Sequence, residues 1–153
     1  MILSIDRALP WFLLPLRLAP EQFTARLLPI ILHHMLADAM ADGELEILDG
    51  RTMGLDVTDA GLRFGFSLKD ECIVTSSASP ADVSIRGDAA AFLALAGGSA
   101  DPDMLFFRRR LSVEGDVALG LSIKNLLESY EPRQRLPAPL RQALEAAAAR
   151  VKV

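Results

Sequence analysis

The sequence predicts an α+β fold, a mostly antiparallel sheet of about five strands with helices covering one face. Short segments of alternating polarity cluster in the middle of the chain, joined by turns too short for crossover connections. A strand, a Gly-Asp pair and an apolar helical stretch then occur twice, as SIRGDAAAFLAL at 84–95 and SVEGDVALGLSI at 112–123. The length of 153 residues suits one such domain.

A helix is expected to begin at Pro20 and Glu21, since proline and acidic residues favour the first turn. Pro29 falls inside it and should kink or split it, and Gly43 should end it. Apolar residues recur every three or four positions, which marks one buried face: Phe23, Leu27, Ile30, Ile31, Met35 and Leu36.

Strands are expected next. Residues 44–48 lead into Asp49-Gly50, a two-residue hairpin signal, and are read as the first strand. Residues 53–57 and 62–68 alternate between apolar and other residues, which indicates one buried face each. A further strand is expected at 72–76, in which Cys72 should be a small buried hydrophobe.

The two repeated units should each turn out of the sheet at glycine and begin a helix. Asp88 and Asp116 are expected to cap those helices by accepting backbone N–H bonds, rather than to act as catalytic acids. Between the units, Asp101-Pro102 should begin a short helix, and the chain should re-enter a strand at Leu111.

The chain is expected to have three parts: an apolar N-terminal segment (1–19), a central folded domain (20–130), and a Pro/Arg linker with a C-terminal helix (131–153). The alanine-rich end favours a helix from Leu140 to about Val151. With only Leu140, Leu144 and Ala148 on one face, that helix should pack lightly or serve as an arm.

Composition indicates a globular, apolar chain, with 51% hydrophobic and 24% charged residues and a mean hydropathy of +0.28. The apolar excess must enter a core, a cavity or the surface. A net charge of −4 without a basic arm argues against nucleic-acid binding. One cysteine cannot form an internal disulfide, which suits the cytosol.

The N-terminal stretch ALPWFLLPL (8–16) is too short to span a membrane and lacks the basic region of a secretion signal. Two interpretations stay open. Trp11 and Phe12 could pack onto the domain, or they could contact a membrane interface or a partner. Burial of this segment in a twofold contact would also give a homodimer.

Catalytic and metal-binding motifs are absent from the sequence. His33 and His34 are adjacent and would diverge by about 100° on a helix, so they cannot face one metal. Asp38 and Asp42 are expected on a solvated face. No nucleophile–base pairing can be assigned, so neither an enzyme nor a cofactor is expected.

Large apolar side chains from several elements should meet under the sheet, either in a closed core or around a cavity for an acyl or isoprenoid chain. Periodicity alone leaves both alternatives open. The candidate lining residues are Met53, Leu55, Phe64, Phe66, Phe92, Met104, Phe106, Phe107, Leu119, Ile123 and Leu127.

The stretch from Ala81 to Leu127 resembles the sterol-carrier-protein type 2 family, with Asp82-Val83-Ser84-Ile85, Gly87-Asp88, an apolar helix, and then Gly115-Asp116 with its helix. The similarity covers roughly 25–130. Within the family, FFRRRLSVEGDVALGLSIKNLLES at 106–129 resembles bacterial accessory factors of anaerobic, oxygen-independent ubiquinone biosynthesis.

The resemblance implies a non-catalytic lipid carrier that binds isoprenoid quinone precursors or phospholipid. It would present these lipids to iron–sulfur hydroxylases of a peptidase-like family, in the cytoplasm or peripheral to the inner membrane. Arg108, Arg109 and Arg110 would then contact lipid headgroups or a membrane, unless they are only a solvated charge cluster. The alternative is a protein–protein interaction module without a lipid cavity.

Overall fold

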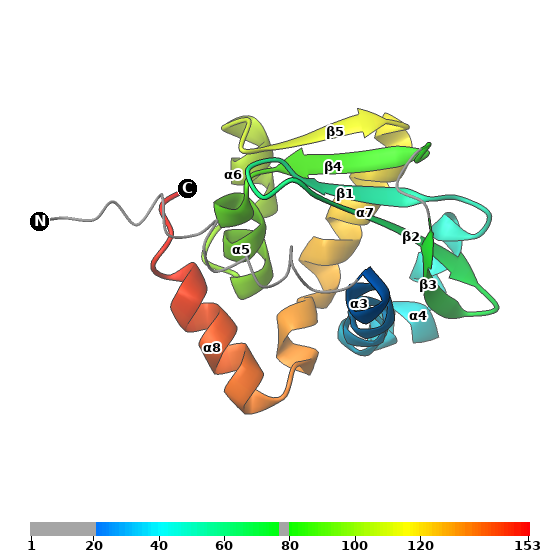
Figure 1. Cartoon of the computed structure of the whole chain (residues 1–153), viewed down its shortest axis with the longest axis horizontal. Helices are drawn as coiled ribbons and strands as arrows, with labels where there is room; N and C mark the ends of the chain where they lie inside the picture. Colours follow the sequence, from blue (N-terminus) through cyan, green and yellow to red (C-terminus); the bar gives the residue numbers. More distant parts are fainter. Residues whose placement is uncertain (1–20, 77–79) are drawn as a thin grey trace, which may run out of the picture.

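The computed structural model describes residues 21–76 and 80–153, so Trp11 and Phe12 lie outside the described residues. Helices gather on one side of a sheet (Figure 1). In chain order the elements are α3 (Glu21–Met35), α4 (Ala37–Ala41), η2 (Glu44–Leu48), β1 (Met53–Val57), β2 (Leu62–Lys69), β3 (Cys72–Ser76), β4 (Val83–Gly87), α5 (Ala89–Gly97), α6 (Pro102–Phe107), β5 (Leu111–Gly115), α7 (Val117–Tyr130), η3 (Pro132–Arg135) and α8 (Ala138–Ala148).

The sheet has five strands in the order β3-β2-β1-β4-β5. The pairs β1–β2, β2–β3 and β4–β5 are antiparallel, but β1 and β4 are parallel, with Met53 opposite Val83. The sheet is therefore mostly antiparallel, as predicted, but it is mixed because the β1–β4 pair is parallel. The β2–β3 hairpin forms the connection between the parallel strands β1 and β4. After this hairpin the chain runs back, and β4 pairs with the edge of β1 that β2 leaves free.

Residues 44–48 form a 3-10 helix, and the predicted strand there is wrong. Gly43, with φ 76°, reverses the chain before it. Leu45 and Leu48 are both buried, and their spacing of three residues fits a helix with three residues per turn. Asp49-Gly50 therefore joins no pair of strands. The β2–β3 hairpin turns at Asp70 and Glu71, whose φ values of 48° and 60° match the turn that twisted hairpins favour.

Helix α3 runs through Pro29 without a break, and the chain interrupts at Leu36 before α4. Gly43 ends this region as predicted. Leu32 and Leu36 pack against the core, whereas Ile30 is 64% exposed. The predicted face is therefore confirmed at Leu36, which belongs to it, but not at Ile30 or at Ile31, which is 39% exposed.

Both predicted helix caps are confirmed. The Asp88 carboxylate accepts from the Ala91 backbone N–H at 2.7 Å, and Asp116 accepts from Leu119 at 3.0 Å. Gly115 has φ 93°, and a Cβ there would lie 2.4 Å from the Asp82 carbonyl oxygen, so glycine is required.

The C-terminal helix packs more closely than expected. Where α8 crosses α5, a Cβ on Gly97 would lie 2.3 Å from the Ala148 Cβ, so the two backbones approach as only glycine permits. Ala148 is fully buried there, and the Ser99 hydroxyl donates to the Ala148 carbonyl at 3.2 Å. Helix α8 is thus part of the domain and not a free arm.

Cys72 is exposed, which corrects the expected buried position. It is the first residue of β3, directly after the hairpin turn, and Ile73 occupies the buried side of the strand. No helix within residues 21–76 and 80–153 has the length and apolar character needed to cross a membrane.

Candidate functional site

A cavity of about 750 Å³ lies between the sheet and the helices. Its size falls within the range of about 300–1,000 Å³ that small-molecule sites occupy. Most of its wall is aliphatic or aromatic and comes from α3, η2, β1, β4, α5 and α7. These apolar residues are Leu32, Met35, Leu36, Leu45, Leu48, Met53, Leu55, Ile85, Phe92, Leu95, Ile123, Leu126 and Leu127.

The polar part of the wall is grouped at the turn between α5 and α6 and at the end of α7. It consists of Ser99, Asp101, Asp103, Glu128, Glu131 and Arg133. The cavity is therefore amphipathic, with an apolar interior and a charged rim. Such a wall suits a ligand with a long apolar part and a small polar end.

Five of the predicted cavity residues line this space: Met53, Leu55, Phe92, Ile123 and Leu127. Phe66 and Leu119 are buried in the core beside it, and Phe64 stacks on Phe66 with ring centroids 6.5 Å apart. The structure brings these eight residues into one apolar body, although only the first five face the cavity.

The three predicted residues of α6 do not line the cavity. Leu105, which is fully buried, takes the inward position of this one short helix. Phe106 is half-buried against the core, whereas Met104 is 42% and Phe107 is 89% exposed. Because a helix has one inward face, neighbours of Leu105 must point sideways or outward.

Several lining residues were not anticipated. Leu45 and Leu48 were assigned to a strand, and their spacing of three was the signal that could have placed them on one helical side. Ile85 and Leu95 belong to the first strand–Gly-Asp–helix unit and face the cavity from β4 and α5. Their apolar character was evident, but not the direction in which they point.

Lys124 ties α6 to α7 at the polar rim. Its Nζ lies 2.7 Å from an Asp103 oxygen and 3.2 Å from a Glu128 oxygen. The hydrogen bond to Asp103, followed by one to Glu128, raises the pKa of Lys124 despite the opposing effect of desolvation. Carboxylate oxygens of Asp101, Asp103 and Glu128 lie within 4.8 Å of one another, so this ammonium offsets a concentrated negative charge.

Asp38 and Asp42 lie on a solvent-accessible face, as expected, and they also anchor the end of α7 and η3. Arg135 donates to both oxygens of Asp38, and the Tyr130 hydroxyl donates to Asp42 at 2.9 Å. The hydrogen bond from Arg135 lowers the pKa of Asp38, and the hydrogen bond to Asp42 raises the pKa of Tyr130. These contacts join α4 to the chain beyond α7, around the cavity wall.

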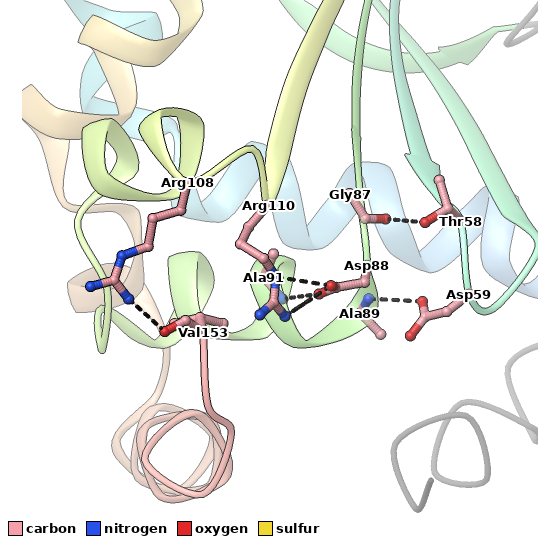
Figure 2. Close-up of polar contacts among 9 residues, drawn as sticks. All are labelled: Thr58, Asp59, Gly87, Asp88, Ala89, Ala91, Arg108, Arg110 and Val153. Atoms are coloured by element: carbon pink, nitrogen blue, oxygen red, sulfur yellow. Dashed lines mark hydrogen bonds and ion pairs between the residues drawn. The ribbon is translucent and has the colours of Figure 1, made fainter. Parts of the chain in front are cut away.

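The three arginines after α6 have different environments, and Figure 2 shows two of them, Arg108 and Arg110. Arg110 forms an ion pair with Asp88, with Nη2 2.8 Å from Oδ2. Arg108 donates to the backbone carbonyl of Val153 at 3.0 Å. Arg109 is exposed with φ 57°. Its backbone N–H donates to the Phe106 carbonyl at 3.0 Å, but within residues 21–76 and 80–153 its side chain has no hydrogen-bond or ion-pair partner.

Among the side chains whose burial is described, no polar or charged residue is buried. The described cavity wall therefore contains no fully buried polar or charged side chain. Its geometry supports enclosing an apolar molecule.

Comparison with known proteins gives a consistent picture. The profile of the SCP-2 sterol transfer family matches residues 31–128. The chain is 40% identical to the ubiquinone biosynthesis accessory factor UbiT of Escherichia coli strain K12 over 130 residues, which are 85% of this chain and 74% of that protein. The UbiT of strain O157:H7 matches to the same extent. Among solved structures, the UbiJ-SCP2 ubiquinone synthesis protein superposes with a TM-score of 0.59 over 72% of this chain and 93% of that one, at 16% identity.

Proposed function

The chain belongs to the SCP-2 sterol transfer family, and from this premise we propose that it is a non-catalytic lipid-binding accessory factor of oxygen-independent ubiquinone biosynthesis. Its ligand is a polyprenylated ubiquinone precursor or a related lipid. The observation that carries the proposal is the amphipathic cavity, with an apolar interior and a polar rim at the α5–α6 turn.

Burial of a hydrocarbon tail supplies the binding free energy, at about 0.8 kcal/mol for each CH₂ group removed from water. The apolar walls of α3, β1, β4 and α7 would enclose the tail, while the ring lies at the rim among Asp101, Glu131 and Arg133. A ring held there is accessible to another protein, although its tail is shielded from water.

The partners that we propose are the separate iron–sulfur hydroxylases of a peptidase-like family that act on the ring. An all-cysteine cluster needs four thiolates, and this chain has one cysteine. The carrier would work in the cytoplasm and exchange lipid at the face of the inner membrane. In this proposal the carrier shields the tail and the hydroxylases modify the ring. Two proteins are needed because a polyprenyl tail is insoluble in water, so a water-soluble enzyme can reach the ring only when another protein covers the tail.

Mass spectrometry of lipids extracted from the purified protein tests the cavity. Isoprenoid or other long-chain lipid should co-purify with the wild type. Ala96→Trp places an indole on the cavity wall and should reduce the bound lipid at least fivefold. Ala146→Trp makes the same change on the exposed side of α8 and is the matched control.

Two outcomes would contradict the carrier function. A wild type that is consistently free of lipid, even when expressed with abundant precursor, would favour an interaction module instead. Equal lipid content in Ala96→Trp and Ala146→Trp would place the lipid elsewhere on the molecule.

Complementation tests the pathway. An E. coli strain that lacks its own UbiT should regain ubiquinone when it expresses this chain during growth without oxygen. Ubiquinone in the same strain grown in air should be unchanged by the chain. Restoration of quinone in both conditions, or in neither, would contradict the proposed role in the oxygen-independent route.

A further inference from the structure

We propose that the end of α6 and the C-terminal tail form a docking surface for a bilayer that contains anionic lipid. This surface, called the α6 surface, consists of Met104, Phe107, Arg108, Arg109 and Lys152. It rests on the proposed function, because a lipid carrier must meet a membrane to load or release its ligand.

The apolar part of the α6 surface is unusually exposed. Phe107 is 89% and Met104 is 42% accessible to solvent, and they are three residues apart on one short helix. A spacing of three residues places both side chains on neighbouring positions of the helix surface. An aromatic ring that projects beside arginine suits the boundary between headgroups and acyl chains.

Three cations surround these side chains. Arg109 follows the helix in the left-handed conformation, is exposed, and has no ion-pair partner within the described part of the chain. Arg108 extends to the carbonyl of Val153, so the C-terminal tail lies against this turn (Figure 2). The contact brings exposed Lys152, the neighbour of Val153, to the same place.

The acids on neighbouring elements do not cancel this charge. Asp88 is engaged by Arg110, and Asp103 is engaged by Lys124. Asp101 lies at the opposite end of α6, where it caps the helix. A terminal carboxylate at Val153 would offset one of the three cations, and carboxylates beyond about 8–10 Å are screened at physiological salt. The α6 surface therefore keeps a local excess of positive charge although the chain carries a net charge of −4.

The position of the α6 surface connects it to the cavity. Asp101, Pro102 and Asp103, at the beginning of α6, form part of the polar rim, and Phe107 ends the same helix. Rim and tip are therefore separated by about one helix length, roughly 9 Å at 1.5 Å per residue. A bilayer docked on Phe107 would therefore lie about one helix length from the polar rim of the cavity.

Vesicle flotation with the full chain tests this surface. We expect binding to phosphatidylcholine vesicles that contain phosphatidylglycerol, little binding to phosphatidylcholine alone, and release at about 1 M salt, where the screening length is about 3 Å. Phe107→Ser and Arg109→Gly should each lower vesicle binding about fivefold. Glycine suits the positive φ of residue 109, so that variant should remain folded.

Matched controls lie elsewhere on the surface. Leu140→Ser removes a half-exposed apolar side chain of α8, and Lys69→Gln removes an exposed cation at the β2–β3 hairpin. Both should bind vesicles as the wild type does. Circular dichroism of every variant verifies that the fold is retained.

The experiments can refute the proposed docking surface and the proposed carrier function independently of each other. Wild-type binding that does not depend on phosphatidylglycerol, or that survives both Phe107→Ser and Arg109→Gly, would overturn the α6 surface. Loss of vesicle binding in these two variants with unchanged co-purified lipid would support it. If the wild type carries no lipid but still shows the variant-sensitive vesicle binding, the docking surface stands and the carrier function fails.

Discussion

Arg110 and Asp88 form a two-point ion pair that joins β5 to the beginning of α5. Arg110 Nε lies 3.0 Å from Asp88 Oδ2, and Nη2 lies 3.0 Å from Oδ1 (Figure 2). The same carboxylate caps α5 at the Ala91 N–H. The Asp88 side chain thus caps α5 and also holds Arg110, the residue before β5, close to the α6 surface.

Asp88→Ala should destabilise the fold by about 1–2 kcal/mol, because it removes a helix cap and the charge partner of Arg110. Asp88→Asn should retain most of the cap, since asparagine is an equally good cap, and should lose only the charge. Urea unfolding monitored by circular dichroism measures both. Equal losses in the two variants would show that the cap contributes nothing.

Gly97→Ala should destabilise the contact between α5 and α8. Alanine gains about 1 kcal/mol in helix propensity over glycine, but its Cβ would lie 2.3 Å from the Ala148 Cβ and 3.0 Å from the Leu144 carbonyl oxygen. Overpacking of this kind costs about 1–3 kcal/mol, so the net effect should be a loss. The free energy of unfolding of the single variant measures it.

A second substitution separates the clash from other effects. Ala148→Gly removes the atom that Gly97→Ala would strike, so the double variant should be more stable than the sum of the two single effects. Ala146→Gly, on the exposed side of the same helix, should give no such coupling. Strict additivity for both pairs would contradict the close helix crossing.

The ion pair between Asp38 and Arg135 should make stability depend on acidity. The hydrogen bond from Arg135 lowers the pKa of Asp38 in the folded state below its value in the unfolded chain, about 3.9. The unfolded state therefore binds the proton more readily. The contribution is present above that pH and is lost as pH falls through the folded pKa.

Asp38→Asn tests this sign. The variant should be less stable than the wild type at pH 7, and the difference should shrink progressively below pH about 3.9 as the wild-type carboxylate becomes protonated. Urea unfolding of both proteins across this acidic range measures the difference. A difference that is constant or grows with acid would mean that the carboxylate charge is not what joins α4 to η3.

The sequence could predict the elements whose pattern is local. Alternation located β1 and β2, the apolar run at 72–76 located β3, and the two Gly-Asp pairs located the strand–helix junctions at Asp88 and Asp116. It could not predict that β4 would pair in parallel with β1, because strand partners are chosen by contacts between distant residues. Residues 44–48 were misassigned because the Asp49-Gly50 pair that follows them resembles a hairpin turn. The burial of both Leu45 and Leu48, three residues apart, instead fits the observed 3-10 helix.

The site was less predictable than the fold. Apolar residues such as Phe92 and Leu127 could be expected under the sheet. Whether such side chains fill the space between sheet and helices or leave a cavity depends on the distance between the backbones, which amino-acid composition does not determine. Phe107 has the same hydrophobicity as Phe66, yet one is outside and the other is in the core. Only the position of Leu105 on the short α6 helix decides which way Phe107 points.

Lys124 should influence which lipid headgroup the cavity accepts. Its ammonium is the cation that bridges Asp103 and Glu128 at the rim. Lys124→Gln leaves these carboxylates and Asp101 uncompensated, so an anionic headgroup entering the rim is repelled more strongly. One charge at roughly 10 Å and an effective dielectric constant of about 40 changes affinity about three- to fivefold.

Quantitative mass spectrometry of extracted lipid should therefore show a lower ratio of anionic phospholipid to neutral isoprenoid lipid in Lys124→Gln than in the wild type. Lys69→Gln, which removes the same charge at the distant β2–β3 hairpin, should leave the ratio unchanged. A ratio that shifts equally in both variants would reflect net charge alone. A ratio that shifts in neither would mean that the headgroup lies away from the α5–α6 turn.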